Sequence, residues 1–314
     1  MQHPQPPSRG PRARGWLALA ALLLAAPAHA APAPIRIGLL RHAQPAALTL
    51  ESPAGWRAGR LAVPGGQPVS VRAAGQTLTL ATAGSRVTAP SLRLEGPGPW
   101  TLSAPGVAAR RYDGDLTLQA SNGRLLPVLA QSLERYVEGA VAGEMLPEWP
   151  AAALEAQAIA SRSYALASTG RHGGEGYDLC DLTHCQRFVA ARFIDPRHAV
   201  AVERTRGRRL VAEGRVAEAL WHSTCGGRTA SNEAVFGGAP RPFLRGVPDA
   251  SWCEDSPHFP AWSIALSRAR LEGVLRAAGR LGPGEPLREV SVVDRLAEGT
   301  VLAVRLAGHR PREL

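Results

Sequence analysis

The sequence contains no lysine, so its 36 basic residues are all arginine, set against 26 acidic residues for a net charge of +10. The many alanine, glycine and proline residues that accompany this bias indicate GC-rich coding. The charge by itself is therefore weak evidence for nucleic-acid binding. The sequence also lacks the recognition helix, the stacking-aromatic motif and the basic tail that are typical of nucleic-acid-binding proteins. We therefore expect no nucleic-acid partner.

Long hydrophobic runs are absent after residue 30, so we expect no transmembrane span once residues 1–30 are removed. Residues 1–30 are typical of a secretory signal peptide: arginines precede an apolar run over 16–26, and small residues at 28–30 fit a cleavage site. An uncleaved membrane anchor is the alternative. No cysteine follows the cleavage site, as a lipoprotein would require. The sequence thus predicts a secreted or periplasmic protein of the cell envelope, whose basic charge would attract anionic envelope polymers.

Cysteine is scarce, with four residues that form two sequence-local pairs. An even number of cysteines in an oxidising compartment predicts one disulfide bond within each pair, Cys180 with Cys185 and Cys225 with Cys253. The alternative for the first pair is a structural zinc ion, because two histidines lie close by. The spacing CDLTHC is not that of a standard zinc-finger knuckle, so we favour the disulfide and expect no cofactor. The ligands of the alternative zinc site would be His172, Cys180, His184 and Cys185.

Residues 31–127 alternate apolar and polar side chains in short runs broken by glycine and proline. This pattern predicts a β-rich region without a group of catalytic residues. The predicted strands cover residues 35–40, 48–52, 69–74, 77–82 and 91–96.

The pattern changes from residue 128, where helix and strand periodicities mix. Helices are predicted over 128–138, 150–168 and 267–278, and antiparallel strands follow the second and third of these helices. Together these features predict an α+β fold. The predicted organisation is a signal peptide (1–30), a β-rich N-terminal region (31–127) and a domain that mixes helices with antiparallel sheet (128–314).

Glu144 lies in an otherwise apolar turn directly before the long alanine-rich helix. A carboxyl group that loses hydration holds a proton more readily, as a general acid must. The structural alternative is that Glu144 only bonds nearby amides at a helix end. Glu148 is a poor second acid because prolines disturb the intervening geometry, and Glu155 is expected to face solvent. Since ordinary glycosidases pair two carboxylates, the scarcity of a suitable second acid nearby favours chemistry that needs only one.

The long helix carries a polar stripe on an apolar cylinder, made by residues three or four positions apart: Gln157, Ser161, Tyr164 and Ser168. We expect Gln157, Arg162 and Tyr164 to support the acid or to bind a substrate. The alternative is that these side chains pack the helix against its neighbours.

The segment HSTCGG, residues 222–227, follows a predicted strand and is expected to form a loop at a sheet edge. His222 with Cys225, or Ser223 as a nucleophile, would make an acyl-transfer enzyme. Residues adjacent on one loop rarely meet in attack geometry, and Cys225 has a disulfide partner in Cys253. We therefore do not favour this class of enzyme.

Several strings together resemble the SpoIID/LytB family, named for the stage II sporulation protein D and the amidase enhancer. The most specific string is EGAVAGEMLPEWPAAALEAQAIASRSYALAS around Glu144. The resemblance continues through CQRFVA, AVERTRGRRLVAEGRVAEALWHSTCGGRTA, PFLRGVPD and CEDSPHF. It covers the chain from about residue 35 onward in family order.

This resemblance implies a function in peptidoglycan metabolism. Members of the family include lytic transglycosylases, for which the glutamate at the position of Glu144 is the proposed catalytic acid. The resemblance places His222, Ser223, Gly226 and Gly227 beside the glycan, where small residues let a sugar approach the backbone. Some members carry a metal bound by histidine and cysteine near Cys180. Other members act only as enhancers of cell-wall amidases, so a non-catalytic glycan-binding protein with an amidase partner is the alternative function. The family pattern also continues beyond GHRPREL, so the C-terminal part of the domain is expected to be missing here.

Overall fold

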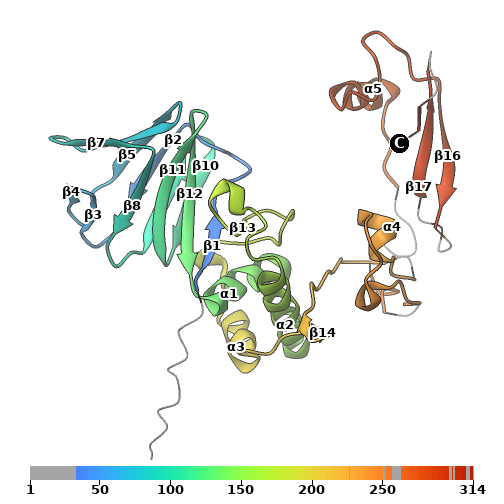
Figure 1. Cartoon of the computed structure of the whole chain (residues 1–314), viewed down its shortest axis with the longest axis horizontal. Coiled ribbons are helices and arrows are strands. Elements are labelled where there is room, and N and C mark those ends of the chain that lie inside the picture. The colour runs from blue at the N-terminus through green and yellow to red at the C-terminus, as the bar shows by residue number, and fades with distance from the viewer. Residues whose placement is uncertain are drawn as a thin grey trace, which may run out of the picture. The chain divides into compact units, whose positions relative to one another are not determined.

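The computed structural model describes residues 33–225, 227–249, 252–256, 263–296, 299, 301–308 and 312–313. The predicted signal peptide at 1–30 lies outside these residues. Within the described ranges, no helix combines the length and the hydropathy that a membrane span requires. The predicted α+β class is confirmed, with a β-rich N-terminal part followed by helices and short antiparallel strands (Figure 1).

The N-terminal part contains two sheets. The first has seven strands in the order β13-β1-β12-β11-β8-β3-β4, and the second has six in the order β10-β9-β2-β5-β6-β7. The bounds are β1 Ile35–Gly38, β2 Ala47–Glu51, β3 Trp56–Ala58, β4 Leu61–Val63, β5 Val69–Ala74, β6 Thr77–Ala81, β7 Arg86–Ala89, β8 Ser91–Glu95, β9 Trp100–Ala104, β10 Val107–Tyr112, β11 Asp115–Ser121, β12 Arg124–Gln131 and β13 Leu179–Cys180. The five predicted strands correspond to β1, β2, β5, β6 and β8.

The alternation that predicted these strands buries one side of each sheet. In β8, for example, Leu92 and Leu94 are buried and the residues between and beside them are exposed. Trp56 and Trp100, one from each sheet, meet edge to face with ring centroids 5.8 Å apart. Buried strands of both sheets share one hydrophobic core, which gives the arrangement of a β-sandwich.

The predicted helix over 128–138 is wrong at its start, because β12 continues through Gln131. This strand pairs with β11 on one side and with β1 on the other, and Leu125 to Leu129 are all buried. Periodicity alone does not show whether a short apolar run forms a buried strand or a buried helix. The predicted boundary between residues 127 and 128 falls inside this strand.

Three helices follow and pack against one another: α1 (Leu133–Glu144), α2 (Ala151–Ala167) and α3 (Pro196–Arg204). The side chain of Ser132 caps α1, and Asp195 with His198 forms a capping box at α3. The predicted long helix is confirmed as α2, with Pro150 directly before it. Short 3₁₀ segments lie at Gly173–Glu175 and Ala191–Phe193.

The remaining elements follow α3 in the chain. They are β14 (Val211–Ala212), β15 (Arg215–Val216), α4 (Asn232–Phe236), a 3₁₀ turn Pro242–Leu244, α5 (Arg268–Ala277), β16 (Glu289–Arg295), β17 (Val301–Ala307) and β18 (Arg312–Glu313). They confirm the helix predicted over 267–278 and the antiparallel strands predicted after the second and third helices, which are the pairs β14–β15 and β16–β17. The segment of α5, β16 and β17 has a small core of its own, made by Leu275, Leu281, Leu287 and Leu306.

Candidate functional site

Glu144 is the last residue of α1 and is half-buried. Its two carboxyl oxygens accept hydrogen bonds from distant parts of the chain. The backbone N–H of Arg187 donates to Oε1 at 2.8 Å, and the indole Nε1 of Trp221 lies 3.4 Å from Oε2. The acid predicted in an apolar turn is therefore a helix-terminal carboxyl group oriented by two N–H donors.

Close packing around α1 makes the first of these bonds possible. A Cβ atom at Gly143 would overlap the carbonyl oxygen of Arg187, so only glycine lets the loop come this near to the helix. One turn earlier, Gly139 makes the same close approach to the ring of Phe188. The two glycines thus bring the 187–188 segment against the end of α1, where the Arg187 N–H reaches Glu144.

Trp221 was not among the residues predicted for the site. Its ring packs edge to face on Tyr164 of α2, with centroids 5.9 Å apart and an interplanar angle of 76°. Its position directly before His222 in the predicted loop was the only sequence signal for it. Trp221 therefore connects the loop that follows β15 to both α2 and the carboxyl group of Glu144.

Arg162 does not fit the substrate-binding role that we expected. Its side chain is 1% exposed, and Nη2 lies 2.6 Å from Oε2 of Glu134. The remaining donors reach backbone carbonyl oxygens of Ala158, Val202 and Arg208. Because these bonds occupy the guanidinium group, Arg162 joins α1, α2 and the end of α3 and is not available to a ligand.

The other polar residues of α2 have mixed positions. Gln157 is half-buried, and its Nε2 donates to the hydroxyl of Ser161 at 3.1 Å. Tyr164 is 3% exposed, and burial raises the pKa of its phenol to about 12. Arg171 lies 3.4 Å from the Tyr164 hydroxyl. Gln157 is thus the one expected α2 residue whose side chain remains partly accessible.

The loop after β15 places His222 and Ser223 at the surface. Gly227 has a φ of +95°, a conformation that favours glycine. Gly226 lies outside the described residues. The contact that we expect between these residues and a sugar chain therefore stays a prediction.

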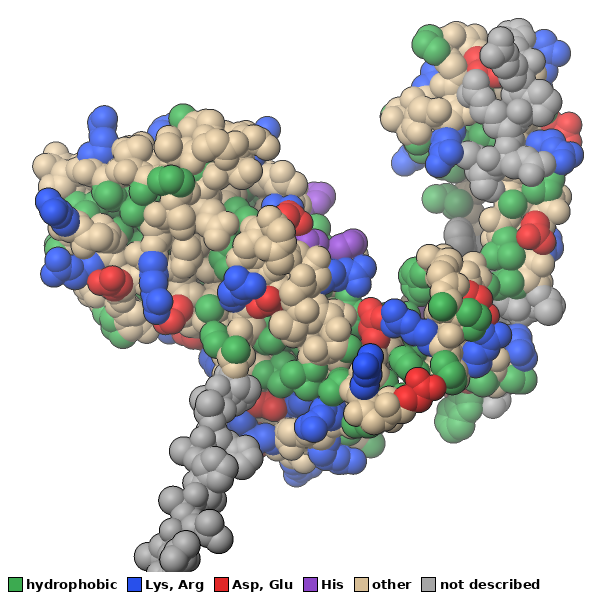
Figure 2. Space-filling view, in the orientation of Figure 1, with side chains coloured by type: hydrophobic (Ala, Val, Ile, Leu, Met, Phe, Trp, Pro, Cys, Tyr) green, Lys and Arg blue, Asp and Glu red, His purple; other side chains and the backbone are tan. Residues whose placement is uncertain are grey.

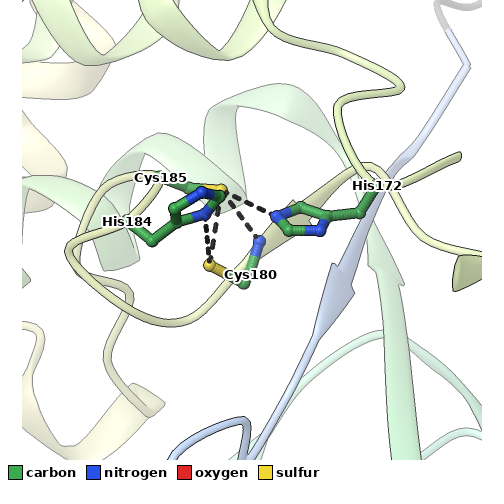
Figure 3. Close-up of side chains that lie close together, drawn as sticks. All are labelled: His172, Cys180, His184 and Cys185. Atoms are coloured by element: carbon green, nitrogen blue, oxygen red, sulfur yellow. Dashed lines mark hydrogen bonds between the residues drawn. The ribbon is translucent and has the colours of Figure 1, made fainter. Parts of the chain in front are cut away.

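A cluster of four side chains forms between residues 172 and 185 (Figure 3). The Cys185 sulfur lies 3.3 Å from the Cys180 sulfur, 3.4 Å from Nε2 of His172 and 3.7 Å from Nδ1 of His184. Cys180 Sγ and His184 Nδ1 are 3.8 Å apart. Four potential metal-binding atoms therefore converge from the 170–176 loop, β13 and the turn that follows it.

The predicted disulfides are not present in the structure. In both pairs the sulfurs are 3.3 Å apart and the cysteines are free, whereas a disulfide bond measures about 2.05 Å. In the first pair the hydrogen bond with Cys185 lowers the pKa of Cys180 to about 4, and the same bond raises the pKa of Cys185. The two sulfurs thus lie within hydrogen-bonding distance of each other, with two imidazole rings directed at them.

Further hydrogen bonds orient His172. Its Nδ1 lies 2.7 Å from Oε1 of Glu175, which leaves Nε2 directed at Cys185. Glu175 is also bound by Arg41 at 2.7 Å and by the Tyr177 hydroxyl at 3.1 Å. The hydrogen bond from His172 holds the pKa of Glu175 below its ordinary value. Such a carboxylate–histidine pair is typical of metal-binding histidines.

The cluster and Glu144 are connected through a short stretch of chain. Only Gln186 separates Cys185 from Arg187, whose N–H binds Glu144. The Gln186 side chain is buried and donates to the carbonyl of Ser161 at 3.2 Å. Whatever holds Cys180 and Cys185 in place therefore also positions the Arg187 amide.

Figure 2 shows arginine side chains scattered over the visible face among acidic ones, and no continuous basic stripe.

These features define an α+β protein in which a helix-terminal glutamate lies beside a histidine–cysteine cluster. Residues 121–211 match the SpoIID family, described as a stage II sporulation protein. A similar curated protein, uncharacterized and from Brachyspira hyodysenteriae, is 35% identical over 137 residues, which cover 43% of this chain and 37% of that protein. The chain thus carries a SpoIID-family domain at 121–211, which confirms the family predicted from the sequence. This membership supports a role related to the cell wall.

Proposed function

We propose that the chain is an exported lytic transglycosylase that cleaves the glycan strands of peptidoglycan, with Glu144 as its acid and base. The observation that carries the proposal is the position of the Glu144 carboxyl group. It lies half-buried at the end of α1, inside the SpoIID segment, and N–H donors from Arg187 and Trp221 orient it. A reacting carboxyl group needs such a fixed position to meet one oxygen of its substrate.

The proposed reaction needs only this one carboxyl group. Protonated Glu144 gives its proton to the glycosidic oxygen between N-acetylmuramic acid and N-acetylglucosamine as the bond from that oxygen to the anomeric carbon breaks. The resulting carboxylate then accepts the proton of the muramyl 6-hydroxyl, whose oxygen bonds to the same anomeric carbon. The products are a 1,6-anhydro sugar and a free hydroxyl group on the neighbouring sugar. The N–H donors of Arg187 and Trp221 support the carboxylate stage because they bind its negative charge.

We further propose that His172, Cys180, His184 and Cys185 hold a structural zinc ion. In a tetrahedral zinc site the sulfurs lie about 3.8 Å apart, and sulfur and nitrogen lie about 3.6 Å apart. The four contacts of 3.3 to 3.8 Å come close to these values. A site with four protein ligands is closed, so the ion would supply rigidity to the turn that carries Arg187.

The test of the proposed enzyme is Glu144→Gln in the full chain, assayed for anhydro-muropeptide release from purified sacculi. Loss of a general acid or base lowers a rate by about 10²–10⁴-fold, and we expect a loss in that range. Glu148→Gln is the matched control, because Glu148 is exposed four residues further on and, within the described part of the chain, pairs with Arg197 alone, at 3.7 Å. Undiminished release by Glu144→Gln would eliminate Glu144 from the mechanism.

The second candidate is a non-catalytic glycan-binding enhancer of a cell-wall amidase. The observation that favours it is Arg162, whose burial removes one of the expected substrate contacts. This function predicts that the unmodified chain sediments with sacculi, releases no soluble sugar and increases the product of an added amidase. Glu144→Gln would then leave that increase unchanged, which separates the two candidates.

A further inference from the structure

A second group of metal-binding side chains lies outside the SpoIID segment. Cys225, Asp249 and Cys253 each offer one ligand atom, and these atoms lie within 4.8 Å of one another. Cys225 Sγ is 3.3 Å from Cys253 Sγ and 3.2 Å from Oδ2 of Asp249. Cys225 is buried, and the other two residues are half-buried.

Backbone pairing brings these residues together. The segments 227–229 and 247–249 run antiparallel, joined by the bridge of Arg228 with Pro248 and by amide bonds on either side of it. The hydroxyl groups of Thr224 and Ser256 lie 2.7 Å apart, which ties the turn containing Cys253 to the residue before Cys225. The three ligand atoms are therefore positioned by the fold of this segment and not by side-chain rotation alone.

The composition of the group indicates what it binds. A disulfide between Cys225 and Cys253 would account for the two sulfurs but not for the carboxylate that faces them. Once both sulfurs are deprotonated, two thiolates and one carboxylate at these distances would concentrate negative charge, and a divalent cation would compensate it. The backbone N–H of Cys225 also points at Cys253 Sγ, at 3.3 Å, which stabilises a charged sulfur.

The geometry points to a second zinc site in this chain, with Cys225, Asp249 and Cys253 as its ligands. Zinc accepts thiolate and carboxylate oxygen ligands, whose mutual distances in a tetrahedral site are about 3.8 Å between sulfurs and about 3.5 Å between sulfur and oxygen. The observed distances are a few tenths of an ångström shorter, so binding requires only a small outward movement of the three side chains. Three protein ligands leave the fourth position to water or another small ligand, unlike the closed set around Cys185.

The test measures bound zinc per chain by native mass spectrometry, on the full chain reduced and equilibrated in a zinc-buffered solution. The unmodified chain is expected to bind two zinc ions. Cys225→Ser with Cys253→Ser should lose one ion, Cys180→Ser with Cys185→Ser should lose the other, and the fourfold variant should lose both. If the Cys180 site holds no zinc, the first pair of substitutions still removes the one ion that remains. The two sites are thus tested independently.

Asp249→Asn separates metal binding from disulfide formation, because it keeps both sulfurs. It should release zinc from the Cys225 site, whereas Asp255→Asn, at an exposed neighbouring carboxylate, should not. Far-UV circular dichroism of both variants checks that they fold alike. The proposal is overturned if the chain binds the same amount of zinc with and without Cys225 and Cys253. It is also overturned if these two cysteines form a disulfide bond, shown by resistance to alkylation before reduction, and bind no zinc after that bond is reduced.

Discussion

Arg162 and Glu134 form an ion pair in which Nη2 and Oε2 are 2.6 Å apart, with the arginine side chain 1% exposed and that of the glutamate 15% exposed. The pair joins α2 to the first turn of α1, the helix that ends at Glu144. The ion pair therefore fixes the start of the helix whose last residue is Glu144. Breaking it should first lower the stability of the fold, and activity only as a result.

Replacing Arg162 by methionine should lower the free energy of unfolding by about 3–5 kcal/mol, the usual cost of removing one partner of a buried pair. The carbonyl oxygens of Val202 and Ala158 lose the hydrogen bonds from the guanidinium group at the same time. Urea unfolding followed by circular dichroism measures the loss. Glu134→Gln and the double variant complete a cycle, in which the two single losses should add up to more than the loss in the double variant. Purely additive losses would contradict a coupling between the two residues.

Trp221→Phe should lower glycan cleavage about five- to thirtyfold, because it removes the indole N–H near Glu144 at a cost of about 1–2 kcal/mol. The phenyl ring keeps the contact with Tyr164, so the unfolding midpoint should change little. Anhydro-muropeptide release and thermal unfolding are measured on the same samples. The exposed Trp252→Phe is the matched control and should leave the rate unchanged. Equal rates for the Trp221 variant and the unmodified chain would show that the indole does not position Glu144.

Asp178 connects β1 to the strand β13, because it accepts bonds from the Arg36 backbone at 2.9 Å and from its guanidinium at 2.9 Å. Burial acts to raise the pKa of Asp178, but the Arg36 bonds outweigh it and the pKa falls below the ordinary value of 3.8. A lowered folded-state pKa means that the stabilisation is present above pH 3.8 and is lost as the pH falls through the folded value. The destabilisation caused by Asp178→Asn should therefore be largest at neutral pH and shrink below about pH 4. Urea unfolding of both chains across this range measures it, and a difference that stays constant with pH would contradict the assignment.

Removing zinc from the cluster of His172, Cys180, His184 and Cys185 should lower the midpoint of thermal unfolding, by about 2–4 °C for each kcal/mol of lost stability. The physical reason is that the ion would cross-link the 170–176 loop, β13 and the following turn. Unfolding is followed with and without a chelator, alongside the zinc content. The variant with Cys180→Ser and Cys185→Ser is the control, and the chelator should shift it less than the unmodified chain. Equal shifts in both chains would place the metal elsewhere.

Much of the architecture was predictable because it depends on local patterns. Strict alternation predicted β2, β5, β6 and β8, and alanine-rich periodicity with a preceding proline predicted α2 to within one residue at each end. The end of β12, residues 128–131, was mistaken for the start of a helix, since this strand is buried on both faces and loses the alternation that identifies a strand. The site was only partly predictable. Glu144 was identified, whereas Trp221 lies 77 positions further along the chain and no local pattern connects the two.

The sequence by itself determined the α+β class, the SpoIID segment at 121–211 and Glu144 as the residue on which the proposed chemistry depends, since each follows from residue order within a short window. Only the tertiary structure decided that Arg162 is a buried structural residue, that the cysteine pairs are joined by His172, His184 and Asp249, and that Arg187 and Trp221 orient Glu144. The physical reason is that hydrogen bonds and metal-ligand geometry depend on distances of a few ångströms between segments that lie far apart along the chain.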